Sequence, residues 1–202
     1  MTHNSKKNVI NSLESSPWPF FAIALSWSWI FWIPLALLGA DITTMPGVLG
    51  LAIGGLGPAI SAIFLTYVAQ GGDQRKDYWK RVIGFSRIPL RWYAVIFLTP
   101  PLYSILALAT GLVFQKSLPF LETPAKYLHN PLSILPFAVI TLFYGPLPEE
   151  LGWRGYALDR LQGKKWNTLS ASIVLGIIWS IWHLPMFFMK GSLQAEIFPL
   201  GS

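Results

Sequence analysis

Four residues in an otherwise apolar stretch have side chains suited to hydrolytic chemistry. The adjacent carboxylates Glu149 and Glu150 precede Arg154, and His183 lies on the next apolar run. Charged side chains in lipid cost several kcal/mol unless they are paired or hydrated, so such residues are functional candidates. A carboxylate beside an imidazole in a wet cavity can bind and deprotonate a water, which is general-base chemistry suited to peptide hydrolysis. We therefore take these four residues as the candidate catalytic group.

The spacing of the four residues predicts how they face one another. On a helix, Glu150 and Arg154 are one turn apart and can pair, whereas Glu149 points about 100° away and is free to face another helix. Trp179 lies one turn before His183 and could cover the cavity. Structural explanations remain open, because the Glu150–Arg154 pair could be purely structural and His183 could bond a freed carbonyl.

No serine arrangement competes with these residues. The sequence contains no GxSxG, and no base stands four residues after Ser180. The chain also contains no cysteine, which excludes disulfides, thiolate metal sites and a cysteine nucleophile.

The pattern Glu149-Glu150-xxx-Arg154, followed by Trp179-xxx-His183, resembles the two motifs of the CPBP family of intramembrane proteases. This family is also called the Abi or CAAX-protease family. The resemblance covers roughly residues 140–190 and includes a GxRG-like context around Arg154. It implies that Glu149 activates the attacking water and that His183 helps to orient it. Glu150 and Arg154 would support the site.

By this resemblance the chain is expected to be an endopeptidase acting on membrane-associated or prenylated-type peptide or protein substrates. Bacterial relatives are associated with peptide maturation and bacteriocin self-immunity, which implies a multi-pass protein of the bacterial inner membrane. No cofactor is expected. A divalent metal is not favoured, because one His and two Glu are few ligands and no HExxH is present.

The resemblance also includes a departure from the family pattern. Family members usually continue through helices that carry a second His and an Asn, and neither residue occurs from Leu184 to Ser202. The alternative is therefore a non-catalytic or truncated membrane protein with an immunity or scaffold role. A proton-relay transporter fragment is a third interpretation, because an intramembrane Glu with a His can relay protons.

Composition indicates an all-α integral membrane protein. Of the 202 residues, 53% are hydrophobic and 12% charged, against about 25% charged in soluble domains. A cytoplasmic tail, residues 1–19, would precede a polytopic domain over residues 20–202, with the motifs at 146–185. About five transmembrane helices are expected, and they are Phe20–Leu38, Val48–Ala69, Trp92–Phe114, Leu132–Gln162 and Leu169–Met189.

Three of these spans carry features that predict local structure. Gly50 and Gly54 form a GxxxG in the second span, which we interpret as intramolecular packing rather than dimerisation. The pair Pro100-Pro101 is expected to interrupt the third span. The fourth is expected to be one long helix bent at Pro146 and Pro148, each of which removes a backbone donor.

Basic residues predict the orientation of the spans. With the N-terminus in the cytoplasm, eleven Lys and Arg fall inside and three outside, as the positive-inside rule expects. Six of the eleven lie in the expected loop Gly71–Arg91. We interpret these basic residues as setting the membrane orientation rather than as a binding site for lipid headgroups.

We therefore expect the lipid bilayer and a peptide substrate as partners rather than nucleic acid. His3 and His129 are expected in solvated segments. The oligomeric state is left open.

The expected distances of Glu149 and His183 from the cytoplasmic face are similar. Glu149 lies 11 residues before Arg160, about 17 Å from the cytoplasmic face at 1.5 Å per residue. His183 lies 14 residues after Leu169, about 21 Å from the same face. Antiparallel helices would hold the two side chains at nearly one depth.

Overall fold

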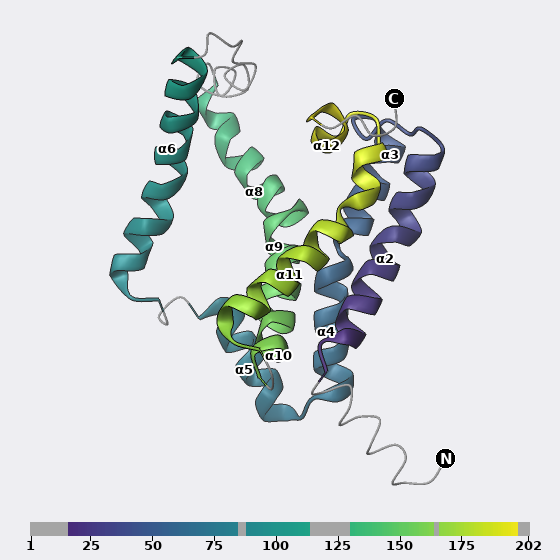
Figure 1. The fold of residues 1–202 in the computed structure, drawn as a ribbon, viewed down its shortest axis with the longest axis vertical. Coiled ribbons are helices and arrows are strands. Elements are labelled where there is room, and N and C mark those ends of the chain that lie inside the picture. The colour runs from purple at the N-terminus through teal and green to yellow at the C-terminus, as the bar shows by residue number, and fades with distance from the viewer. Residues whose placement is uncertain (1–15, 85–87, 114–129, 164–165, 198–202) are drawn as a thin grey trace. The chain divides into compact units, whose positions relative to one another are not determined.

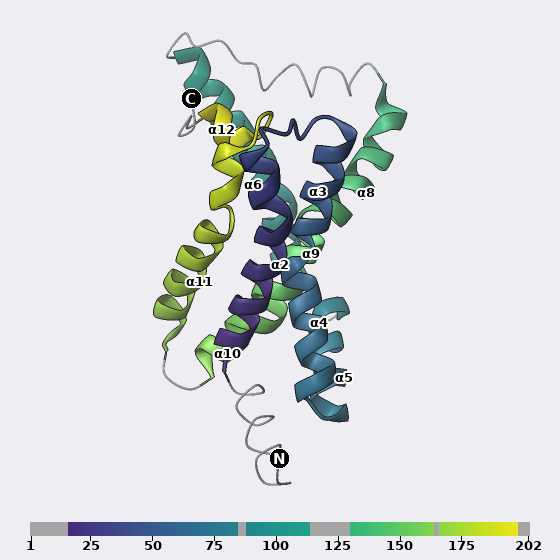
Figure 2. The ribbon, with the colours of Figure 1, turned by 90° about the vertical axis from the view of Figure 1, so that its right-hand side faces the viewer.

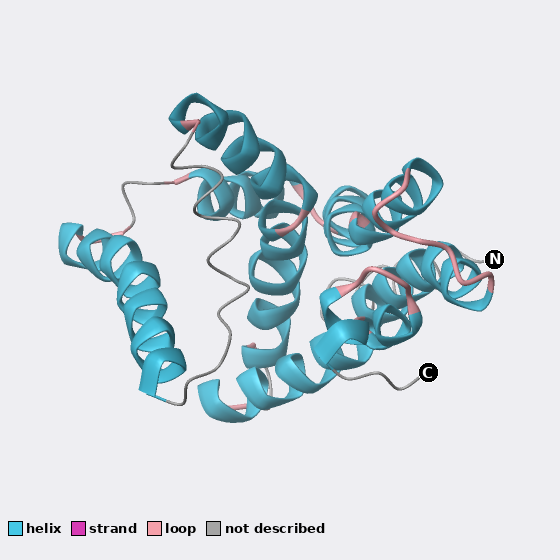
Figure 3. Cartoon of the chain, turned by 90° about the horizontal axis from the view of Figure 1, so that it is seen from above, coloured by secondary structure: helices cyan, strands magenta, loops and turns pink. Residues whose placement is uncertain are grey.

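The protein is all-helical in the part of the chain that the computed structural model describes, which is residues 16–84, 88–113, 130–163 and 166–197 (Figure 3). These residues form no strand, only an isolated bridge between Asp41 and Lys190. Five helices are long and apolar enough to cross a membrane, namely Trp18–Leu37, Met45–Ala69, Leu90–Gly111, Ile134–Gln162 and Thr168–Phe188. The expected all-α class and the five spans are confirmed.

The chain forms two compact units. The first contains the residues up to Val82 and those from Thr141 onward, and the second contains Ile83–Ile140. The second unit holds helix α6, Leu90–Val113, a 3₁₀ turn, Pro131–Ser133, and most of α8, Ile134–Tyr144. The expected interruption at Pro100-Pro101 is wrong, because α6 continues through both prolines. The expected solvated positions His3 and His129 lie outside the described residues.

Helix α2, Trp18–Leu37, lies in the first unit and packs against α3, Met45–Gly55, α4, Gly57–Ala69, and α11, Thr168–Trp182 (Figures 1 and 2). The expected intramolecular role of the GxxxG is confirmed. A Cβ on Gly50 would lie 2.8 Å from the Leu35 side chain, and one on Gly54 would lie 2.2 Å from the Trp32 indole nitrogen. Glycine therefore permits close approach to α2.

The second span breaks at Leu56, and buried polar side chains satisfy the freed backbone. Pro58 has no N–H, so the carbonyl of Gly54 lacks its usual helical donor. Ser28 Oγ donates to this carbonyl at 2.6 Å, and Trp182 Nε1 donates to Ser28 Oγ at 2.7 Å. Trp29 Nε1 in turn donates to the carbonyl of Trp182 at 3.1 Å. This chain of hydrogen bonds fixes the end of α11 against α2.

Helix α5, Gly72–Ile83, replaces most of the expected basic loop. Its apolar residues Tyr78, Trp79, Val82 and Ile83 recur at helical spacing. Tyr78 is fully buried, and its hydroxyl donates to the carbonyl of Leu151 at 3.1 Å. Burial raises the pKa of Tyr78 to about 12, because the ionised phenolate would lose its hydration. Helix α5 is therefore a packed element of the first unit.

The segment that carries the first motif is broken where the prolines predict. Helix α8 ends at Tyr144, and α9, Pro146–Gly152, follows Gly145, whose φ of −126° and ψ of −89° are not helical. A π-helical turn, Trp153–Ala157, and α10, Leu158–Gln162, complete the span. The sequence did not predict the π-helical turn. A Cβ on Gly152 would lie 2.4 Å from Pro58, which shows how closely α9 approaches α4.

The last span is shorter as an α-helix than expected. Helix α11 ends at Trp182, His183 is its C-cap, and a 3₁₀ turn, Leu184–Phe188, continues the chain. His183 was expected inside a helix, but it lies at the helix end. The α-helix stops here because Pro185 has no backbone N–H to donate to a carbonyl of the preceding turn. A short helix α12, Leu193–Ile197, follows.

Candidate functional site

Glu149 and His183 are brought together by Trp179. The indole Nε1 of Trp179 donates to Glu149 Oε2 at 2.7 Å, which joins α11 to the first turn of α9. The backbone carbonyl of the same tryptophan lies 2.9 Å from His183 Nδ1. The carboxylate of Glu149 also interacts electrostatically with the imidazole. The two motifs therefore meet at Trp179.

The carbonyl contact fixes the tautomer of a neutral His183. A carbonyl oxygen can only accept, so Nδ1 must carry the hydrogen and donate it to Trp179. Nε2 is then left with a free lone pair, which can accept a hydrogen bond from a water. His183 is partly exposed and lies at the end of α11, where Trp29 donates to the backbone carbonyl of Trp182 and Ser28 accepts from the Trp182 indole. The ring is thus attached to a rigid part of the fold.

Glu150 and Arg154 pair with each other, as predicted, but on another side of the segment. They line a pocket of about 280 Å³ whose wall includes Arg81 and Val82 of α5. This volume holds several waters at about 30 Å³ each. The four candidate residues therefore form two pairs, with Glu149 turned toward α11 and Glu150 turned toward α5.

Two contributions to this region were not predicted. Trp179 was expected to cover the cavity, yet its indole is a direct hydrogen-bond donor to Glu149. Tyr78 was placed in a loop, yet its hydroxyl holds α5 against the carbonyl of Leu151 next to the π-helical turn. The helical spacing of Tyr78 and Val82 is the signal that identifies α5 as a packed helix.

A metal does not fit the arrangement around Glu149. Over the described ranges, no group of three or more His, Asp or Glu side chains is placed so that it could hold a metal ion. Catalytic zinc sites use three protein ligands, whereas here one imidazole lies near one carboxylate whose Oε2 already accepts a hydrogen bond.

The fold and this arrangement define a polytopic membrane protein with a semi-buried carboxylate–imidazole pair, and comparison with known proteins gives its family. The family model described as type II CAAX prenyl endopeptidase Rce1-like matches residues 131–201, which include all four candidate residues. A CAAX prenyl protease 2 of Methanococcus maripaludis is 30% identical over 192 residues, which cover 94% of this chain and 69% of that protein. The chain belongs to the CAAX-protease family of membrane proteases.

Proposed function

We propose that this protein is an intramembrane endopeptidase that hydrolyses peptide bonds with a water activated by Glu149. The observation that carries the proposal is the double attachment to Trp179, whose indole binds the Glu149 carboxylate and whose carbonyl binds His183 Nδ1. One water between the two side chains would then meet a base and a second acceptor.

The arrangement supports the following sequence of steps. Oε2 of Glu149 is occupied by the indole, so Oε1 takes a proton from the water. The water oxygen bonds to the carbonyl carbon of the scissile peptide and keeps its second hydrogen, which donates a hydrogen bond to Nε2 of His183 and so orients the attack. The proton on Glu149 then passes to the leaving nitrogen as the C–N bond breaks. The products are a carboxylic acid and an amine.

Glu150 and Arg154 would support this chemistry without touching the water. The two paired residues are one helical turn apart, and their ion pair spans the start of the π-helical turn. Since π-helical turns are frequent at functional sites, we propose that the pair holds this turn and thereby the orientation of α9.

For the substrate, we propose membrane-associated peptides, including prenylated ones, because a 30% identical relative is named a CAAX prenyl protease. Peptide maturation or bacteriocin self-immunity would be the setting. We propose the bacterial cell membrane as the location, with the N-terminus cytoplasmic. The distribution of basic residues supports this orientation.

The test is cleavage of a fluorogenic peptide by the purified chain in lipid nanodiscs. Glu149→Gln preserves the shape of the side chain but removes the base, so the rate should fall at least about a hundredfold. Glu196→Gln makes the same change at an exposed carboxylate of α12 and should leave the rate unchanged. A Glu149→Gln variant that cleaves within twofold of wild type would overturn Glu149 as the base. Absence of cleavage by the wild-type chain itself would favour a non-catalytic immunity or scaffold role.

A further inference from the structure

The backbone carbonyl of Trp182 receives a hydrogen bond from a side chain of α2. A carbonyl near the end of a helix normally accepts from the N–H three or four residues further on. For Trp182 the nearer of these residues is Pro185, which has no N–H. The farther one is Met186, whose N–H donates to the His183 carbonyl at 2.9 Å. Trp29 Nε1 donates to the Trp182 carbonyl at 3.1 Å and so completes the turn at which His183 lies.

The indole of Trp182 is held by Ser28, the residue before Trp29. Trp182 Nε1 donates to Ser28 Oγ at 2.7 Å, and this hydroxyl donates to the carbonyl of Gly54 at 2.6 Å. Ser28 and Trp182 are both buried, so water does not readily replace these hydrogen bonds. Two consecutive residues of α2 thus hold one residue of α11 by its backbone and by its side chain.

Trp182 also limits where the imidazole of His183 can lie. The two rings meet edge to face, with centroids 4.6 Å apart and an interplanar angle of 80°. The Trp179 indole contacts the imidazole as well, with centroids 5.5 Å apart, and the Trp179 carbonyl lies 2.9 Å from Nδ1. Because His183 follows Trp182 directly and packs on its ring, a shift of Trp182 would move Nδ1 relative to this carbonyl.

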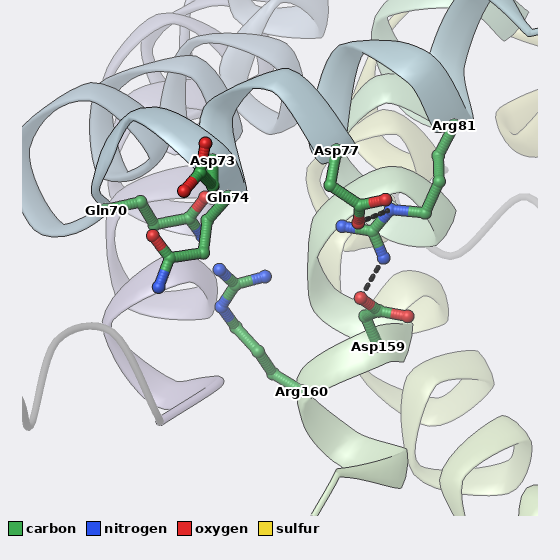
Figure 4. A pocket seen from close by; sticks show the side chains of 7 residues that line it. All are labelled: Gln70, Asp73, Gln74, Asp77, Arg81, Asp159 and Arg160. Atoms are coloured by element: carbon green, nitrogen blue, oxygen red, sulfur yellow. Dashed lines mark hydrogen bonds and ion pairs between the residues drawn. The ribbon is translucent and has the colours of Figure 1, made fainter.

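The span that carries Glu149 has an attachment of its own. Arg81 bridges Asp77 of its own helix and Asp159, which ties α5 to α10 (Figure 4). This bridge does not involve α2. Loss of the hydrogen bonds from α2 to α11 should therefore disturb His183 more than it disturbs Glu149.

We propose that Ser28 and Trp29 are positioning residues for His183, an inference that rests on the proposed function. Their hydrogen bonds reach Trp182, and they act on the imidazole through it. They keep His183 in the form that carries hydrogen on Nδ1, with the lone pair of Nε2 available to the attacking water. Without them the ring would also adopt the other tautomer, in which Nε2 carries the hydrogen and cannot accept from the water.

The experiment measures the tautomer of His183 by ¹⁵N NMR. The full chain is labelled at histidine and placed in lipid nanodiscs at about pH 8.5, where free imidazole is neutral, and His183→Ala identifies the signal. Trp29→Phe keeps an aromatic ring but removes the donor to the Trp182 carbonyl. The ratio of the Nδ1–H to the Nε2–H tautomer should therefore fall about three- to tenfold. Ser28→Ala removes the acceptor of the Trp182 indole and should lower the ratio by a similar factor.

Cleavage of the fluorogenic peptide gives the second measurement. In both variants kcat should fall about three- to tenfold while KM stays unchanged, because the water and not the peptide is misplaced. Two control variants remove similar groups elsewhere. Trp27→Phe removes an indole donor to the Ile53 carbonyl at 2.8 Å, and Ser61→Ala removes a buried hydroxyl that donates to the Gly57 carbonyl at 2.7 Å. Neither hydrogen bond involves α11, so both controls should keep the wild-type tautomer ratio and kcat.

A tautomer ratio that is unchanged in both Trp29→Phe and Ser28→Ala would overturn the proposal. A changed ratio with an unchanged kcat would also overturn it, as would equal changes in the two control variants. The tautomer is measured without cleavage. A wild-type chain that cuts no peptide would therefore contradict the proposed function, and the tautomer ratio would still decide whether Ser28 and Trp29 position His183.

Discussion

Replacing Tyr78 by phenylalanine removes one hydroxyl from the contact between α5 and the carbonyl of Leu151. The hydrogen bond is 3.1 Å long and partly buried, and Tyr78 itself is 1% exposed, so its loss should lower the free energy of unfolding by about 1 kcal/mol at neutral pH. The tyrosine also makes stability depend on pH, because burial raises its pKa from 10.0 to about 12.

The sign of this dependence follows from the raised pKa. Below pH 10 the phenol is neutral in both states, and its contribution to stability is complete. Between pH 10 and 12 the unfolded chain ionises Tyr78 first, so wild type loses stability, by about 1.4 kcal/mol at pH 11. The Tyr78→Phe variant lacks this loss. Its deficit of about 1 kcal/mol at pH 7 should therefore disappear by pH 11.

The assay is equilibrium unfolding of both proteins in mixed micelles, followed by tryptophan fluorescence at pH 7, 9 and 11. Other groups titrate in the same range, but they contribute equally to both proteins and cancel in the difference. A deficit of the variant that stays constant from pH 7 to pH 11 would refute the burial of this hydroxyl.

Two further substitutions test the contacts around the candidate site. Trp179→Phe keeps the ring but removes the donor to Glu149, so kcat for the fluorogenic peptide should fall about ten- to a hundredfold; an unchanged kcat would show that this hydrogen bond is dispensable. Gly152→Ala places a Cβ 2.4 Å from Pro58 and should lower the free energy of unfolding by about 1–3 kcal/mol. Gly176→Ala in α11 meets nothing within 4 Å and should not destabilise, and equal losses in both variants would contradict the close packing of α9 on α4.

The spans could be predicted from the sequence because hydrophobic length alone determines them. The expected Phe20–Leu38 and the observed Trp18–Leu37 differ by only two residues and one residue at their ends. The break at Leu56 was missed, although Gly57-Pro58 was visible, because the surrounding residues are uniformly apolar. Helix α5 was missed because its basic residues dominated the interpretation of that segment over its apolar spacing.

Part of the candidate site could also be predicted. The rotation of about 100° between consecutive helical residues predicted that Glu149 and Glu150 would face different partners, and the ion pair with Arg154 followed from helical spacing. The donor to Glu149 could not be predicted. It depends on how α11 is rotated about its axis, which a single sequence does not determine.

The most direct test of the account is a double-mutant cycle on Glu149 and His183, measured as the rate of peptide cleavage in nanodiscs. Both residues contact Trp179, and in the proposed mechanism both act on one water. The variant carrying Glu149→Gln and His183→Ala together should therefore be no slower than the slower single variant, as for residues that act as a unit. Rate losses that multiply would show that the two side chains act independently and would contradict the shared water.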